Sequence, residues 1–160
     1  GCSGGQEAYS LAMIIASYMK NYKDWDILIL ATDIDRNMLN KGQDGVYSFE
    51  EVESLPEKFA KKYIHKSKDE KYNIDPELKK MVRFKPLNLL HEWPFKNMFD
   101  VIFCRNVLIY FDNETKESLV DRFSKKILPN GMLYLGHSEA RAGDNENLKA
   151  VGRSSFQRVA

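Results

Sequence analysis

The sequence has few cysteines, little net charge and no long hydrophobic run, and each absence excludes a class of protein. Cys2 and Cys104 lack the spacing of a metal site and are too few for a disulfide-stabilised secreted scaffold, so we expect reduced thiols, a cytoplasmic protein and no metal. The net charge of +1 predicts no broad attraction to nucleic acid or to an anionic membrane. No apolar run reaches the roughly 18 residues of a membrane span. We therefore expect a protein that is not embedded in a membrane and binds no nucleic acid.

What is present is an alternation of helical and strand patterns over 160 residues, a length typical of one domain. Short apolar runs predict buried strands, and apolar residues three and four positions apart predict helices. The expected strands are 27–31, 99–104 and 132–135, the expected helices are 7–20, a short one through Leu39 and one from 113, and a closing hairpin is expected at 148–151 and 156–159. This order predicts an α/β fold with a mostly parallel sheet covered by helices on both faces.

Residues 46–86 interrupt this alternation, because they are polar and irregular and yet contain recurring aromatic residues. Leu55-Pro56-Glu57 predicts a short helix with proline at an early helical position. Alternating stretches at 72–75 and 81–84 predict small strands. We interpret 46–86 as an inserted subdomain, with 1–45 and 87–160 as the core.

Polar residues follow each predicted core strand, and in an open parallel sheet ligands bind beyond the carboxyl ends of the strands. These residues are Asp33 after the first strand, Arg105 and Asn106 after the second, and His137, Ser138 and Glu139 after the third; Ser3, Gly4, Gly5 and Glu7 precede the first helix. We expect the four groups to converge on one site.

The opening stretch Gly1-Cys2-Ser3-Gly4-Gly5 has two interpretations. It matches the G-x-S-x-G nucleophile elbow, and Ser3, Asp100 and His137 follow the chain order of α/β-hydrolases. However, Asp100 begins its strand and so lies at the wrong edge of the sheet, which disfavours a hydrolase. The stretch also matches a glycine-rich turn that lets a ligand approach the backbone closely, although it is not the dinucleotide pattern G-x-G-x-x-G. We favour the second interpretation.

Two carboxylates indicate which ligand such a turn would hold. Asp33 can accept hydrogen bonds from both hydroxyls of a ribose, or it can cap the next helix. Glu7 at a helix N-terminus is unsuited to a phosphate and suits a cationic ligand such as S-adenosylmethionine (SAM), which carries a sulfonium and an ammonium and no phosphate; alternatively it only favours the helix dipole.

Five motifs, in order and spanning essentially the whole chain, resemble those of the CheR-type chemotaxis receptor glutamate methyltransferases. The first, Ser3 to Ser10, is similar to S-T-G-E-E-P-Y-S of that family, with Gly4, Gln6 and Ala8 as departures. The others are Ala31-Thr32-Asp33-Ile34-Asp35, Asn88-Leu89-Leu90, Cys104-Arg105-Asn106-Val107-Leu108-Ile109-Tyr110-Phe111 and Leu135-Gly136-His137-Ser138-Glu139.

The resemblance implies a Rossmann-like class I methyltransferase sheet with a small inserted β-subdomain, and a helical domain and first core strand upstream of residue 1. It also implies site residues. Ser3, Gly5, Glu7, Asp33, Asn88, Leu89, Arg105 and Asn106 would bind SAM, with Asn88 and Leu89 near the adenine, and Arg105 and Tyr110 would be catalytic. Packing against the sheet is the alternative for Tyr110, and a surface ion pair is the alternative for Arg105. For His137 we expect a structural role.

The reaction implied by the resemblance is methyl transfer from SAM to glutamate side chains of bacterial chemoreceptors, leaving S-adenosylhomocysteine and a methyl ester. The partner would be the cytoplasmic domain of a chemoreceptor, and we expect a monomer. The loop at 66–71 lacks the glycine-rich insert of members that grip a receptor's C-terminal peptide, so we expect no such tether. A non-catalytic SAM-binding signalling module and a methyltransferase for another acceptor remain as alternatives.

Overall fold

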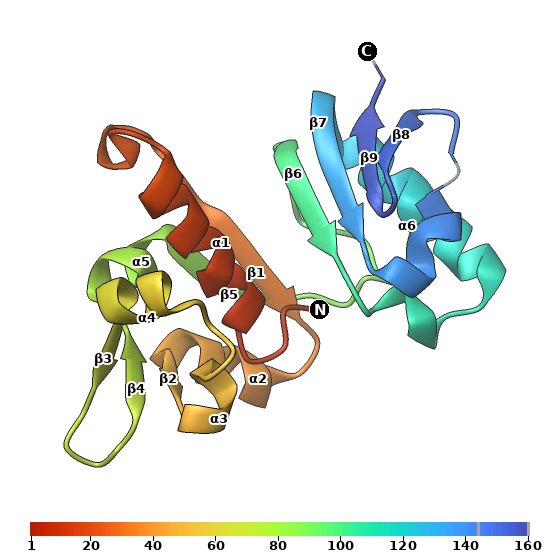
Figure 1. Ribbon diagram of the computed structural model, residues 1–160. Helices are drawn as coiled ribbons and strands as arrows, with labels where there is room; N and C mark the ends of the chain where they lie inside the picture. The colour runs from red at the N-terminus through yellow and green to blue at the C-terminus, as the bar shows by residue number, and fades with distance from the viewer. Residues whose placement is uncertain (144, 160) are drawn as a thin grey trace. The chain divides into compact units, whose positions relative to one another are not determined.

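The computed structural model describes residues 1–143 and 145–159, so two positions of the expected core segment 87–160 lie outside the described residues. The chain divides into two compact units, one of residues 2–88 and one of residues 89–160 together with Gly1. Figure 1 shows the helices and strands of both units. Each unit has its own hydrophobic core, the first around Tyr9, Ala12 and Leu78, the second around Leu108, Leu133 and Leu135.

The first unit is built on two parallel strands, β1 (Ile29–Asp33) and β5 (Val82–Pro86), with Asp33 opposite Pro86 at their carboxyl ends. Helix α1 (Gln6–Tyr18) packs on this pair, and α2 (Arg36–Asp44) follows β1 (Figure 1). The strand expected at 27–31 thus begins two residues later. The strand expected at 81–84 is β5, which pairs with β1.

Helix α2 is longer than expected, because Gly42 does not break it. Asp35 caps its N-terminus by accepting hydrogen bonds from the N–H groups of Asn37 and Met38. Gly42 lies inside the helix, where a Cβ would collide with the ring of Phe84, so the glycine allows close packing. Gly45 ends the helix with φ +59, the left-handed conformation typical of a C-terminal glycine.

A small antiparallel sheet with the order β2–β4–β3 lies within the expected insertion. Its strands are β2 (Val46–Tyr47), β3 (Ile64–Lys66) and β4 (Tyr72–Ile74), and the helices between and after them are α3 (Phe49–Val52), α4 (Glu57–Tyr63) and α5 (Pro76–Met81). The β3–β4 hairpin ends in an exposed tip closed by a hydrogen bond from Ser67 N–H to the Lys71 carbonyl, 2.8 Å. Glu70 in this tip has φ +61.

The second unit is a four-stranded mixed sheet with the order β6–β7–β9–β8. Strand β6 (Phe99–Cys104) is parallel to β7 (Ile127–Leu135), and β9 (Ser155–Arg158) is antiparallel to both β7 and β8 (Leu148–Gly152), which confirms the closing hairpin. Helix α6 (Asn113–Lys126) is capped by Asp112, one of the two capping residues, Asp112 and Asn113, that the sequence offers. Its residues Leu119, Val120 and Phe123 are buried in the core.

Candidate functional site

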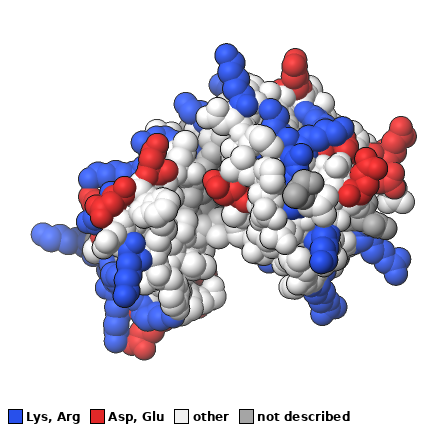
Figure 2. Space-filling model, turned by 90° about the horizontal axis from the view of Figure 1, so that it is seen from above, with Lys and Arg blue, Asp and Glu red and all other residues white. Residues whose placement is uncertain are grey.

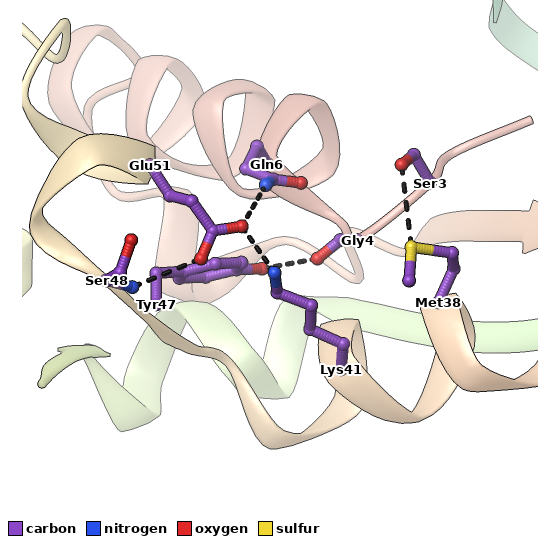
Figure 3. A network of polar contacts seen from close by, with 8 residues as sticks. All are labelled: Ser3, Gly4, Gln6, Met38, Lys41, Tyr47, Ser48 and Glu51. Carbon is purple, nitrogen blue, oxygen red and sulfur yellow. Dashed lines mark hydrogen bonds and ion pairs between the residues drawn. The ribbon is translucent and has the colours of Figure 1, made fainter.

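The glycine-rich turn before α1 contains two of the expected cofactor-binding residues, Ser3 and Gly5. Both have left-handed backbone conformations, with φ 47 at Ser3 and φ 89 at Gly5. The turn is fixed by hydrogen bonds from Cys2 N–H to the Thr32 carbonyl, 2.8 Å, and from Gly5 N–H to the Cys2 carbonyl, 3.0 Å. The Ser3 hydroxyl lies 3.8 Å from the sulfur of Met38 (Figure 3). A thioether is not a base, so this contact does not activate Ser3 as a hydrolase nucleophile.

Asp33 is the last residue of β1, and its carboxylate joins the strand end to this turn. Oδ2 accepts a hydrogen bond from Ser3 N–H at 2.8 Å, and Oδ1 accepts one from Asp35 N–H at 3.0 Å. The structure therefore brings Ser3 and Asp33 together, as expected for one site. Capping of the next helix, the alternative for Asp33, falls instead to Asp35.

The surroundings of the turn are acidic. The half-buried Cys2 thiol has its pKa raised to about 11, chiefly by burial; the N-terminal ammonium lowers it, and the carboxylates of Asp33 and Glu7 raise it. Both carboxylates thus act on the same turn, with Glu7 in the first turn of α1.

Asn88 follows β5 at the same edge of the sheet. Because β1 and β5 are parallel and in register, Asp33 lies opposite Pro86, and Leu87 N–H donates to the Asp33 carbonyl at 2.9 Å. Asn88 is the next residue along the chain. The first unit thus places Ser3, Gly5, Asp33 and Asn88 around the carboxyl ends of its two parallel strands.

The remaining expected residues, Leu89, Arg105, Asn106 and Tyr110, lie in the second unit. Arg105 and Asn106 follow β6 directly, and Asn106 is left-handed with φ 58. Tyr110 ends the short 3-10 helix η2 (Leu108–Tyr110) with 79% of its surface exposed. The alternative that Tyr110 packs against the sheet is therefore wrong.

Glu139 is a residue whose role the sequence did not reveal. It is buried, with 4% of its surface exposed, and its carboxylate accepts three backbone hydrogen bonds, from Asn106 at 2.9 Å, Ile109 at 3.1 Å and Gly136 at 2.7 Å. It therefore fixes the segment that carries Asn106 and Tyr110. The only sequence signal was its place in Gly136-His137-Ser138-Glu139, where His137 attracted attention; His137 Nδ1 lies 3.2 Å from Ser154 Oγ.

Arg122 and Trp93 are two further residues missed from the sequence, and both hold the segment that contains Leu89. Arg122 of α6 donates to the carbonyls of Leu89 and His91, both at 2.6 Å, and its guanidinium lies 4.1 Å from the centre of the Trp93 ring. Trp93 Nε1 also donates to the Leu89 carbonyl, at 3.0 Å. The Leu89 carbonyl therefore accepts two donors, and the Leu89 side chain is partly buried against the core of the second unit.

Among residues 1–143 and 145–159, no group of three or more His, Cys, Asp or Glu side chains could hold a metal ion. In the same described part of the chain, no helix is long and apolar enough to cross a membrane. On the face drawn in Figure 2, basic and acidic side chains are interspersed, in keeping with the net charge of +1.

Parallel strand pairs, a glycine-rich turn and an acid at a strand's carboxyl end define a Rossmann-like α/β fold of the class I methyltransferases. A solved structure with this fold is the N-methyltransferase NodS from Bradyrhizobium japonicum WM9 in complex with S-adenosyl-L-homocysteine. Its TM-score is 0.55 at 12% sequence identity, and the similarity covers 99% of this chain and 74% of that one. At this identity the likeness shows the fold alone.

The family model for the CheR methyltransferase, SAM binding domain, matches residues 1–156, and the chain belongs to this family. It is 40% identical to a chemotaxis protein methyltransferase of Borreliella burgdorferi over 160 residues, covering 99% of this chain and 56% of the relative. It is 39% identical to a probable chemotaxis protein methyltransferase of Rhizobium etli, covering 91% of this chain and 56% of the relative. The chain thus spans about half the length of these relatives. The match confirms the expected family and fold class and agrees with SAM as the cofactor.

Proposed function

We propose that this chain provides the SAM-binding part of a methyltransferase that converts glutamate side chains of chemoreceptors into methyl esters. Family membership supports SAM as the methyl donor, and the names of the relatives support an acceptor in chemotaxis. The observation that carries the proposal is the 2.8 Å contact between Ser3 N–H and the Asp33 carboxylate, which joins the glycine-rich turn to the end of β1. Because the chain spans about half of its relatives, activity, acceptor and partner are all part of the proposal.

The residues of the first unit have the chemistry to hold this cofactor. Each oxygen of the Asp33 carboxylate accepts one backbone N–H and retains capacity for a second donor, as binding of ribose hydroxyls requires. Glu7 would pair with the ammonium of the methionine end. Ser3 and Gly5 would offer backbone groups; glycine is required at position 5 because φ is +89 and a Cβ there would collide with Phe84.

We propose the following roles for residues of the second unit. Leu89, next to Asn88, would contact the adenine, and Arg105 and Asn106 would lie near the methionine end or the reacting carboxylate. Tyr110 would line the place of methyl transfer. Arg105 and Tyr110 are the residues we propose as catalytic.

The proposed chemistry needs no general base in the protein. The cofactor supplies a methyl group bound to a positively charged sulfur. The acceptor glutamate, with a pKa of about 4.3, is already ionised at neutral pH. The role of Arg105 and Tyr110 is therefore to orient the carboxylate and exclude water, since alignment of the reacting atoms is worth a large part of such a barrier. His137 has no proton to transfer in this scheme.

Calorimetric titration with S-adenosylhomocysteine tests the cofactor site. We expect Asp33→Ala and Glu7→Ala to abolish binding, and Asp33→Asn, which keeps the shape of the side chain, to weaken it strongly. Asp26→Ala removes an exposed acid from the same unit and serves as the matched control. Wild-type affinity in both alanine variants would contradict the assignment of these residues.

Transfer of a radiolabelled methyl group to chemoreceptor cytoplasmic fragments tests the reaction, with release of volatile label by base as the mark of a methyl ester. Binding without transfer would indicate a non-catalytic signalling module. Transfer to other components of a cell extract, but not to receptors, would indicate another acceptor.

We also propose that the protein acts in the cytoplasm as a monomer and docks on the receptor without a C-terminal pentapeptide tether. A peptide with the sequence of the receptor C-terminus should therefore not compete with the receptor fragment for the protein.

A further inference from the structure

A buried tyrosine of the small sheet reaches the glycine-rich turn. Tyr47 of β2 has only 2% of its surface exposed, and its hydroxyl donates a hydrogen bond to the Gly4 carbonyl at 2.7 Å (Figure 3). Its ring meets that of Tyr9 edge to face, with ring centres 6.3 Å apart. Burial raises the pKa of Tyr47 above its ordinary value, so the hydroxyl remains a donor at neutral pH.

A second contact joins the same segment to the first turn of α1. The carboxylate of Glu51 in α3 accepts hydrogen bonds from Gln6 Nε2 at 3.1 Å, from Lys41 Nζ, and from Ser48 N–H at 3.1 Å. Figure 3 shows Glu51 between Gln6 of α1 and Lys41 of α2. The hydrogen bond from Lys41 lowers the pKa of Glu51, which is therefore charged at neutral pH.

The Gly4–Gly5 peptide is held by one hydrogen bond at each of its polar groups, from Gly5 N–H to the Cys2 carbonyl at 3.0 Å and from the Tyr47 hydroxyl to the Gly4 carbonyl. The peptide unit between Gly4 and Gly5 is flanked by two residues without a Cβ, and glycine adopts positive and negative φ about equally. Ser3 is held in a left-handed conformation that a residue with a side chain adopts only at a cost. Asp33 fixes the Ser3 N–H, and Tyr47 fixes the Gly4 carbonyl.

We propose that Tyr47 is a positioning residue for the cofactor site: its hydroxyl fixes the Gly4–Gly5 peptide so that the turn keeps the conformation that receives SAM. The inference rests on the proposed function and deepens it. It assigns to the segment after α2 a part in cofactor binding, through a residue that contacts the turn and not the cofactor. Without the hydroxyl, this peptide keeps only the hydrogen bond from Gly5 N–H to the Cys2 carbonyl, so it is less restrained and part of the population no longer presents the binding conformation.

The test compares the loss of a buried tyrosine hydroxyl at two positions of the first unit, one beside the glycine-rich turn and one away from it. Tyr47→Phe removes the hydroxyl and keeps the ring. Tyr63→Phe is the control, because Tyr63 is also buried in this unit and its hydroxyl lies 3.0 Å from Ser17 Oγ. We expect both variants to lower the unfolding midpoint similarly. Only Tyr47→Phe should raise the Kd for S-adenosylhomocysteine, roughly fivefold, the worth of about one net hydrogen bond.

A second variant guards against misfolding of the first. Glu51→Gln keeps the shape of the side chain, removes its charge, and should weaken binding in the same direction. Wild-type affinity in Tyr47→Phe, or equal weakening in Tyr63→Phe, would overturn the inference while leaving the proposed function intact. Failure of the wild-type chain to bind S-adenosylhomocysteine at all would overturn the proposed function and this inference with it.

Discussion

Glu139 offers the sharpest test of how the second unit holds its part of the site. Its buried carboxylate accepts three backbone N–H groups, from Asn106, Ile109 and Gly136. Replacement by alanine leaves all three donors without this acceptor, and an unsatisfied buried donor costs about 1–3 kcal/mol. The sum of roughly 3–9 kcal/mol is comparable with the whole stability of an ordinary domain, about 5–15 kcal/mol. We therefore expect Glu139→Ala to remove a large part of the stability of the unit.

The conservative variant separates the charge from the shape. In Glu139→Gln the amide oxygen still accepts, but the amide nitrogen must face one N–H, so we expect a loss of about 2–4 kcal/mol. Guanidinium unfolding followed by circular dichroism measures both changes, with Glu146→Ala, an exposed acid of the same unit, as the control. A loss below about 1 kcal/mol in Glu139→Ala would refute the reasoning, because it would mean that water or a neighbour satisfies these donors equally well.

Three further predictions concern other groups. Arg122→Lys should destabilise the protein by about 1–2 kcal/mol in denaturant unfolding, because one ammonium cannot reproduce the planar fork that reaches both the Leu89 and His91 carbonyls. Glu51 has a pKa lowered from 4.5, so its stabilising contribution is present above about that pH and is lost as the pH falls through the lower folded value; Glu51→Gln should flatten this part of an acid titration of unfolding. Cys2, with a pKa of about 11, should be roughly one-thousandth thiolate at pH 8 and react with iodoacetamide about tenfold faster per pH unit, as followed by mass spectrometry.

Local patterns were sufficient to predict most elements but not their ends. The apolar run from Ile27 predicted a strand, yet β1 begins at Ile29, because its extent is set by pairing with β5 about fifty residues later. On α1 the apolar spacing selects Ala8, Leu11, Ala12, Ile15 and Met19. Of these Ala8 and Ala12 are buried, but so are Tyr9, Met13 and Ala16, which the spacing does not select. Both cases depend on partners that are distant in sequence.

In the candidate site, too, residues in local motifs were predicted and residues that act on distant partners were not. Ser3, Gly5 and Asp33 were found from short motifs because backbone-rich turns and strand-end acids have recognisable sequence signals. Tyr47 and Arg122 were not found, because they act on carbonyls 43 and 33 residues away, and a carbonyl acceptor carries no side-chain signature. Asn106 was expected near the cofactor, but its left-handed backbone could be seen only in the structure.

The hairpin between β3 and β4 has a consequence for how this fold can vary. Its tip, 67–71, closes on itself through Ser67 and Lys71, and its residues Lys68 to Lys71 are exposed. Doubling the length of such a loop costs only about 0.6 kcal/mol of closure entropy. The tip can therefore gain or lose residues while the parallel register of Asp33 and Pro86 stays the same. Insertions or deletions at this point of the chain therefore cost the parallel strand pair almost nothing in stability.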